Sequence, residues 1–107
     1  HILGHQTGED RSLCAREIMR VLRPSGRLFC CDFSDRDFRF GNGTETGPGT
    51  FVRGNGIRTH YFTPGEVRDL FPLLYEESLG NRTWAMRIRG KDYTRCEIRP
   101  VFVKRDA

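Results

Sequence analysis

The chain has 107 residues, of which 36% are apolar and 30% charged, and its formal net charge is +4. This length suffices for one small domain or part of a larger one, and it excludes a second folded domain. No apolar run approaches the ~20 residues of a membrane-spanning helix, and the first residues lack the pattern of a signal peptide, so we expect no membrane contact.

Residues 9–22 are predicted to form the first helix, because their apolar side chains recur at helical spacing between charged ones. Pro24 and Gly26 end this helix, since proline disfavours helical geometry before it and glycine permits a reversal. Residues 27–33 form a short apolar run without alternation. Such a run is typical of a strand covered on both faces, as in a parallel sheet flanked by helices.

The middle of the chain is rich in glycine and polar residues. Residues 34–49 predict a long loop of the kind that is usually functional or disordered. Residues 50–53 and 57–62 flank Gly54-Asn55-Gly56, which predicts a tight β-hairpin. We therefore expect the hairpin to close over a site.

A second helix is predicted to begin after Thr63. This residue can cap the helix, Pro64 suits the first helical position, and Glu66 can reach back to the cap. Pro72 limits the length of the helix. Its apolar stripe consists of Val67, Leu70, Phe71 and Leu74.

The last third predicts two paired strands. Residues 82–89 alternate between apolar and polar side chains, which indicates an amphipathic strand. Residues 90–92 predict a turn, and residues 101–103, apolar on both faces, indicate a return strand inside a sheet. The whole order predicts an α/β fold whose last strand pair is antiparallel. The side chains expected to face the core are Trp84, Met86 and Ile88.

The same third is basic, with eight Lys and Arg residues against three Asp and Glu residues in positions 78–107. Such a field attracts polyanions, so we expect Arg87 and Arg89, which would point outward, and Lys91 in the turn to contact RNA. The alternative is a basic face that only keeps the protein in solution.

The cysteines and histidines do not predict a metal site. The four cysteines have no C-x-x-C spacing, and the three histidines have no third ligand at suitable spacing. Cys30 and Cys31 lie in an apolar run and are expected to be reduced core residues. This favours an intracellular, cytoplasmic setting, with the nucleus or an organelle as alternatives.

Several short motifs point to one family. Residues 21–28, Val-Leu-Arg-Pro-Ser-Gly-Arg-Leu, resemble the Leu-(Lys/Arg)-Pro-Gly-Gly turn before the fifth strand of class I S-adenosylmethionine-dependent methyltransferases. Cys31-Asp32-Phe33 resembles the Arg-Asp-Tyr of the tRNA 3-methylcytidine methyltransferases, and residues 55–63 resemble their Asp-Gly-Thr-Arg-x-Tyr-Phe-Phe-Thr. Shorter matches are Arg39-Phe40, Phe51-Val52-Arg53 and Leu70-Phe71.

This resemblance implies that residues 1–107 are the C-terminal half of a methyltransferase domain. The implied fold is the C-terminal part of a Rossmann-like α/β fold, with a buried strand, a hairpin insertion at residues 34–62 on the substrate side and a terminal antiparallel strand pair. The cofactor would be S-adenosyl-L-methionine, bound mainly by a missing N-terminal half that carries the glycine-rich turn. We expect the chain alone to be inactive and its full-length parent to methylate a tRNA base.

The resemblance also implies the site residues. Asp32, at the carboxyl end of a strand, is the candidate catalytic residue, with loop bonding as the structural alternative. Phe33 and Phe40 can stack on a flipped base or pack in the core. Arg53 and Arg58 flank the hairpin turn and can bind one phosphate or carboxylate, with a solvated pair of hairpin arginines as the alternative. The expected substrate-binding residues are Phe33, Arg39, Phe40, Arg53, Arg58 and Tyr61.

Two other functions stay open. One is a noncatalytic RNA-binding module derived from this fold, which would bind tRNA without binding the cofactor. The other is half of a small-molecule or protein methyltransferase, which would act on free metabolites or proteins but not on tRNA.

Overall fold

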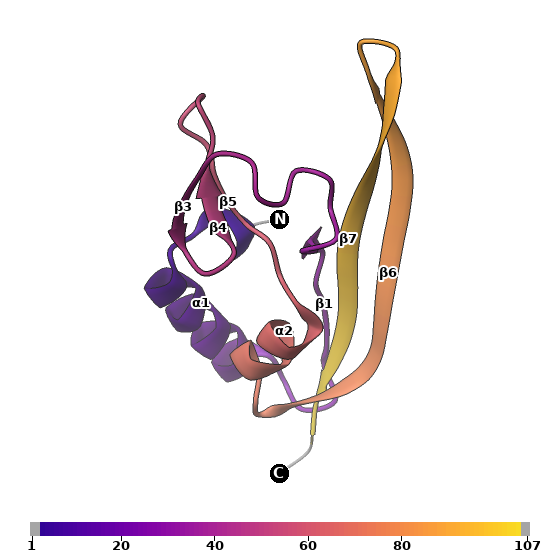
Figure 1. Ribbon diagram of the computed structural model, residues 1–107. Coiled ribbons are helices and arrows are strands. Elements are labelled where there is room, and N and C mark those ends of the chain that lie inside the picture. The colour runs from indigo at the N-terminus through magenta and orange to yellow at the C-terminus, as the bar shows by residue number, and fades with distance from the viewer. Residues whose placement is uncertain (1–2, 106–107) are drawn as a thin grey trace.

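The computed structural model describes residues 3–105, and Figure 1 shows a long twisted β-hairpin facing two helices and a smaller sheet. A four-stranded sheet contains β1, β2, β6 and β7, and a three-stranded sheet contains β3, β4 and β5. In chain order the elements are η1 (Leu3–His5), α1 (Gly8–Val21), β1 (Arg27–Phe29), β2 (Asp32–Phe33), β3 (Thr44–Gly47), β4 (Thr50–Val52), β5 (Arg58–His60), α2 (Pro64–Leu70), β6 (Leu74–Ile88) and β7 (Lys91–Lys104).

Strand β7 is the centre of the larger sheet. It pairs with β6 along one edge and with β1 and β2 along the other, and every pairing is antiparallel. The antiparallel terminal pair and the internal position of residues 101–103 are thus confirmed. The expectation of a parallel strand covered on both faces is wrong for residues 27–33, since β1 is antiparallel to β7 and Phe29 is 73% exposed.

Pro100 explains why this run is two strands and not one. Both β1 and β2 keep the same register against β7, with Phe29 opposite Val101 and Asp32 opposite Ile98. Between them, Cys30 donates its N–H to the Pro100 carbonyl at 3.1 Å. Proline has no N–H to donate in return, so the ladder is interrupted at this pair.

The helix caps follow the sequence closely. As expected, Thr63 caps α2, and its hydroxyl accepts a hydrogen bond from the Glu66 N–H at 3.2 Å. Thr7 caps α1, which the sequence analysis did not predict. The Glu66 carboxylate does not complete the capping box, because it bonds the His60 imidazole 2.6 Å away. Leu74 belongs to β6 and not to the helical stripe, since α2 ends at Leu70.

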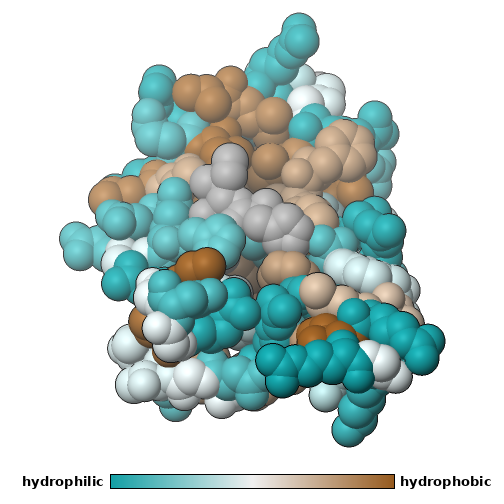
Figure 2. All heavy atoms as spheres, turned by 90° about the horizontal axis from the view of Figure 1, so that it is seen from above, coloured by the Kyte–Doolittle hydropathy of each residue, from teal (hydrophilic) through white to brown (hydrophobic). Residues whose placement is uncertain are grey.

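The core lies between the helices and one face of the larger sheet. Phe62, Phe71, Ile98 and Phe102 are each 1% exposed. The ring centroids of Phe71 and Phe102 are 5.2 Å apart. Most of the remaining surface is hydrophilic, and in Figure 2 the hydrophobic side chains gather mainly toward the top of the view. No described helix is long and apolar enough to cross a membrane.

The smaller sheet extends the predicted hairpin. β4 and β5 pair as expected, with Phe51 opposite Thr59. The expected loop at residues 34–49 is shorter than predicted, because β3 pairs with the free edge of β4. Polar strands without alternation carry little signal in a sequence, so β3 was missed.

The β6–β7 hairpin turns at Arg89-Gly90, one residue earlier than predicted. Ile88 pairs with Lys91, and both turn residues have positive φ, 50° for Arg89 and 79° for Gly90. This is the geometry of a two-residue type I′ turn, which matches the twist of the flanking strands.

Arg89 is poorly suited to this turn, because a side chain with a Cβ is strained at positive φ. We expect Arg89→Asn to raise the free energy of unfolding by about 0.5–1 kcal/mol, since asparagine tolerates this conformation. Urea denaturation measures the change. Arg87→Asn, in the adjacent strand, is the matched control and should give no gain.

The apolar face of β6 is not the core face. Trp84 and Met86 lie opposite Arg95 and Tyr93, on the side of β7 that also carries Glu97, whereas the core side chains Ile98 and Phe102 point the other way. The expectation that Trp84, Met86 and Ile88 face the core is therefore wrong. They are half-buried on the face of the sheet away from the helices.

Candidate functional site

The loop between β2 and β3 is anchored by Asp37. Its side chain is fully buried and accepts hydrogen bonds from Arg95 Nε at 2.8 Å, the Cys96 N–H at 2.9 Å and the Arg39 N–H at 3.1 Å. A buried ion pair stabilises a fold only when further hydrogen bonds satisfy it, as they do here. Asp37 thus holds residues 38–40 against β7.

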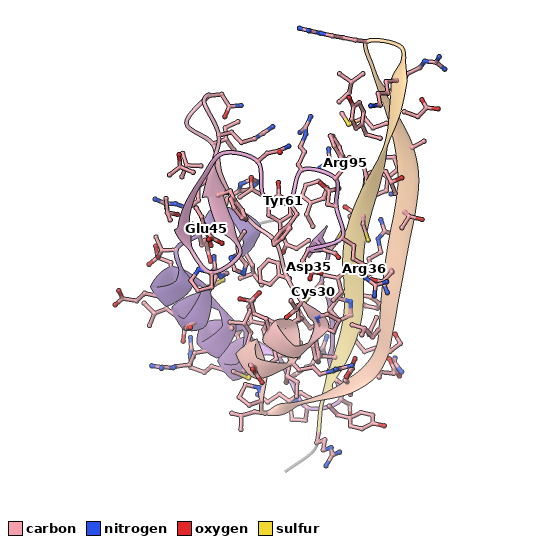
Figure 3. All side chains as sticks on the ribbon, in the orientation of Figure 1. Cys30, Asp35, Arg36, Glu45, Tyr61 and Arg95 are labelled. Carbon is pink, nitrogen blue, oxygen red and sulfur yellow. The ribbon has the colours of Figure 1, made fainter. Side chains whose placement is uncertain are left out.

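Aromatic rings from four segments meet beside this anchor. Tyr61 is 4% exposed, and its ring centroid lies 5.8 Å from that of Phe40, 6.2 Å from that of Phe51 and 6.5 Å from that of Phe33. Phe40 is 44% exposed and is the accessible ring of the group. Figure 3 shows Tyr61 between the smaller sheet and β7, with Arg95 on the β7 side.

Three arginines surround these rings. Burial lowers the pKa of Arg39, and the neighbouring charges of Arg95 and Arg53 lower it further. Arg95 is compensated by Asp37, and its guanidinium carbon lies 4.2 Å from the centroid of Phe33. The Nε of Arg53 is buried and has no hydrogen-bond partner among the described residues. Neither Arg39 nor Arg53 has an ion-pair partner among the described residues, whereas Arg95 has one in Asp37.

Tyr61 is suited to donate a hydrogen bond. Burial raises the pKa of its phenol, and the Asp37 carboxylate adds to this effect, while the three arginines oppose it. The net shift in the pKa is upward, so the phenol is neutral at pH 7 and keeps its proton.

We name these aromatic rings and arginines together the Tyr61 cluster. It consists of Phe33, Arg39, Phe40, Phe51, Arg53, Tyr61 and Arg95.

Five of the six predicted substrate-binding residues belong to this cluster, and Arg58 does not. In the β4–β5 register, Gly49, Phe51 and Arg53 share one face with Tyr61, whereas Arg58 lies opposite Val52 on the other face. The expectation that Arg53 and Arg58 point at one phosphate is therefore wrong, because the period of two directs them apart.

Asp32 is also separate from the cluster. It is adjacent to Phe33 in β2, so its side chain points to the opposite face, where it is 7% exposed. Burial raises the pKa of its carboxyl, and a hydrogen bond from the Gly4 backbone partly offsets this. A Cβ at Gly4 would lie 2.6 Å from Asp32 Oδ1, so a larger residue at position 4 would displace the Asp32 side chain. The catalytic role of Asp32 stays a prediction.

The predicted RNA contacts lie at the turn end of the β6–β7 hairpin and are not members of the Tyr61 cluster. Arg87 donates a hydrogen bond to the Gly90 carbonyl at 3.2 Å, and the Lys91 ammonium lies 5.5 Å from the Tyr93 ring centroid. Arg89 lies in the turn itself and not in the strand. All three are exposed, so their role in RNA binding also stays a prediction.

Gly43 allows the anchored loop to return onto β4. It has a φ of 98°, and a Cβ there would overlap the Val52 carbonyl oxygen. We expect Gly43→Ala to lower the free energy of unfolding by about 3 kcal/mol, from conformational strain plus the clash. Gly41 has a φ of 90° with no heavy atom within 4 Å of a Cβ, so Gly41→Ala isolates the strain and should cost about 1–2 kcal/mol. If thermal unfolding shows the same loss of stability for Gly43→Ala and Gly41→Ala, the structure relieves the clash with Val52.

The four cysteines are free thiols. Burial raises the pKa of Cys30 to about 11, so its thiol is protonated at neutral pH. Cys31 lies on the face of the larger sheet that carries Glu97, and its thiol is 3.1 Å from Glu97 Oε2. Among residues 3–105, no group of three or more metal-ligating side chains is close enough to hold a metal ion.

The α/β fold is similar to part of a solved methyltransferase. A crystal structure of a S-adenosylmethionine-dependent methyltransferase from Methanosarcina mazei superposes with a TM-score of 0.62 and 20% sequence identity, over 92% of this chain and 53% of that protein. The predicted α/β class and the likeness to an S-adenosylmethionine-dependent methyltransferase are therefore confirmed, whereas the C-terminal part of a Rossmann-like fold stays a prediction.

The relative found by sequence is a methyltransferase whose name states its substrate. The chain is 37% identical over 65 residues to the tRNA N(3)-cytidine methyltransferase METTL2 of Danio rerio. The match covers 58% of this chain and 18% of that protein, and the chain spans about half of the solved methyltransferase. No family model matches the chain. The two relatives support a class I methyltransferase-like family.

Proposed function

We propose that this chain is the substrate-side part of an S-adenosylmethionine-dependent methyltransferase that acts on a tRNA base of the 3-methylcytidine type. The observation that carries the proposal is the Tyr61 cluster. It combines an exposed ring, Phe40, with two guanidinium groups that have no carboxylate partner among the described residues. A nucleotide has both a flat base and an anionic phosphate, so it complements this cluster.

The residues of the cluster have separate tasks in this proposal. Phe40 stacks on the base, and Arg39 and Arg53 bind the adjacent phosphates. The neutral Tyr61 phenol donates a hydrogen bond to an acceptor on the base and thereby orients it. Asp37 and Arg95 act as positioning residues, because they hold the loop that carries Arg39 and Phe40. Positioning the nucleophile in line with the methyl group supplies much of the rate of such a transfer.

The cofactor does not fit the Tyr61 cluster. S-adenosyl-L-methionine carries a sulfonium cation, and three guanidinium groups beside one paired carboxylate would repel it. In the part of the chain that the structure describes, no glycine-rich turn joins a strand to a following helix. We therefore propose that the cofactor binds to another part of the full-length protein, and that this chain alone is inactive.

The open edge of β1 supports a larger parent. No described strand pairs with the second edge of β1, and Phe29 on this strand is 73% exposed. An exposed, apolar strand edge is a site for pairing with further chain. A partner strand from the rest of a methyltransferase domain would cover it.

The proposal is tested by methyl transfer. The chain is expressed alone and with the sequence that its gene encodes before His1, and transfer of labelled methyl groups to tRNA is measured. We expect transfer only with the longer protein, at a cytidine N3. Transfer to free metabolites or proteins but not to tRNA would indicate the small-molecule or protein methyltransferase. Binding of tRNA without any transfer would indicate a noncatalytic module.

A further inference from the structure

A second concave site lies on the opposite face of the β4–β5 hairpin from Tyr61. Thr50 and Arg58 share this face, and the first turn of α1 and the end of β3 close the site on the other sides. Its lining includes Gly8, Arg11, Thr46, Gly47, Thr50 and Arg58. None of the lining side chains is acidic.

Arg11 brings a buried positive charge to this site. The residue is 7% exposed; its Nη1 donates a hydrogen bond to the Gln6 carbonyl at 2.6 Å, and its guanidinium carbon lies 5.8 Å from the centroid of Phe62. The other terminal nitrogen, Nη2, borders the site, because a Cβ at Gly8 would lie 3.6 Å from it. A buried guanidinium of this kind requires a compensating anion.

The nearby carboxylates are engaged elsewhere. Both oxygens of Glu66 lie within 2.7 Å of His60 Nε2, whose other ring nitrogen is 2.6 Å from the Thr50 hydroxyl. Asp32 accepts the Gly4 backbone hydrogen bond described above. Among the described residues, no carboxylate lies within ion-pair distance of Arg11 or Arg58.

Arg58 adds a second charge to the same site. Burial is the main cause that lowers the pKa of Arg11; Glu66 and Asp32 oppose it from a distance, and Arg58 lowers this pKa further. Two guanidinium groups thus adjoin one small concavity without an ion-pair partner in the described part of the chain. Gly8 and Gly47 also line the concavity and have no side chains to fill it.

We propose that this site binds a phosphate group between the guanidinium groups of Arg11 and Arg58. Phosphate is the ligand that arginine pairs recognise with directed hydrogen bonds. The phosphate belongs either to an RNA backbone or to a free nucleotide or phosphate ion. The site is distinct from the Tyr61 cluster and does not depend on the proposed methyltransferase function.

The test is an NMR titration of the 107-residue chain with inorganic phosphate at constant ionic strength. We expect saturable shifts of the Gly8 and Gly47 amides with a Kd of about 1–10 mM. Arg58→Gln, an exposed substitution, should weaken binding about tenfold. Arg16→Gln, an exposed residue of α1 that does not line the site, is the matched control and should leave the phosphate Kd unchanged. Because binding is read at the Gly8 and Gly47 amides with inorganic phosphate, and not from methyl transfer, failure of the proposed function does not affect this result.

Two further arms identify the source of the phosphate. If tRNA displaces phosphate and Arg58→Gln weakens tRNA binding, the site takes an RNA backbone phosphate. If tRNA does not compete but adenosine monophosphate binds more tightly than phosphate, it takes a free nucleotide. Absence of saturable shifts up to about 50 mM phosphate, or equal shifts in the Arg58→Gln variant, would overturn the proposal.

Discussion

Replacement of Asp37 by asparagine is expected to lower the free energy of unfolding by about 3 kcal/mol. The substitution removes the charge that compensates buried Arg95 and weakens the bonds to the Cys96 and Arg39 N–H groups. An uncompensated buried guanidinium is then left beneath the loop that carries Phe40. Urea denaturation followed by far-UV circular dichroism measures the loss.

Two variants serve as controls for this result. Asp35→Asn, in the same loop, changes the charge by the same amount and should alter stability by less than about 0.5 kcal/mol. The double variant Asp37→Leu with Arg95→Met removes both charges and should recover part of the loss, because no charge then remains buried. A stability for Asp37→Asn within about 1 kcal/mol of the wild type would show that the ion pair does not hold the loop.

The double variant Arg39→Gln with Arg53→Gln is expected to weaken tRNA binding by about 10- to 100-fold at low salt. Both guanidinium groups lie in the Tyr61 cluster without a carboxylate partner of their own, so they are free to contact phosphate. Each phosphate contact contributes about 0.7–0.9 to the slope of log affinity against log salt. We therefore expect the slope of the double variant to be shallower by about 1.4–1.8, measured by filter binding at several salt concentrations.

Controls separate this site from general charge. Arg16→Gln with Arg23→Gln removes the same charge from the exposed surface near α1 and should change affinity little. Arg87→Gln with Arg89→Gln tests the hairpin that the sequence predicted as the RNA surface. A larger loss there than in the Tyr61 cluster would make the hairpin the principal contact. Wild-type affinity and slope for Arg39→Gln with Arg53→Gln would remove the cluster from the tRNA surface.

Family motifs identified the residues that line the Tyr61 cluster but not the residues that hold it in place. Short matches to a known family selected Phe33, Arg39, Phe40, Arg53 and Tyr61, and the structure brings these five together. They did not select the buried pair that holds the loop. Asp37 and Arg95 are 58 positions apart in the chain, and neither stands in a local pattern that distinguishes it from a surface charge.

The side chains that the sequence analysis placed on the wrong face of a sheet share one cause. Alternation correctly predicts that Trp84, Met86 and Ile88 share a face, but it does not say which face of the sheet meets the helices. The same limit applies to Arg53 and Arg58, since their separation depends on the register of β4 with β5. A period within one strand carries no information about the partner that covers it.

The sequence by itself determined the features that depend on neighbouring residues. Thr63 and Pro64 start α2, Pro24 and Gly26 follow the end of α1, and Gly56 has the positive φ of the β4–β5 turn. Caps and turns of this kind are made by atoms a few positions apart.

Only the tertiary structure decided which strands pair and which charges are buried. β7 lies between β6 and the two short strands because distant segments bury their apolar faces together, and Pro100 then divides β1 from β2. Arg11 and Arg95 become buried for the same reason. Whether a charge is buried depends on contacts with residues far along the chain, and these contacts form only when the whole core packs.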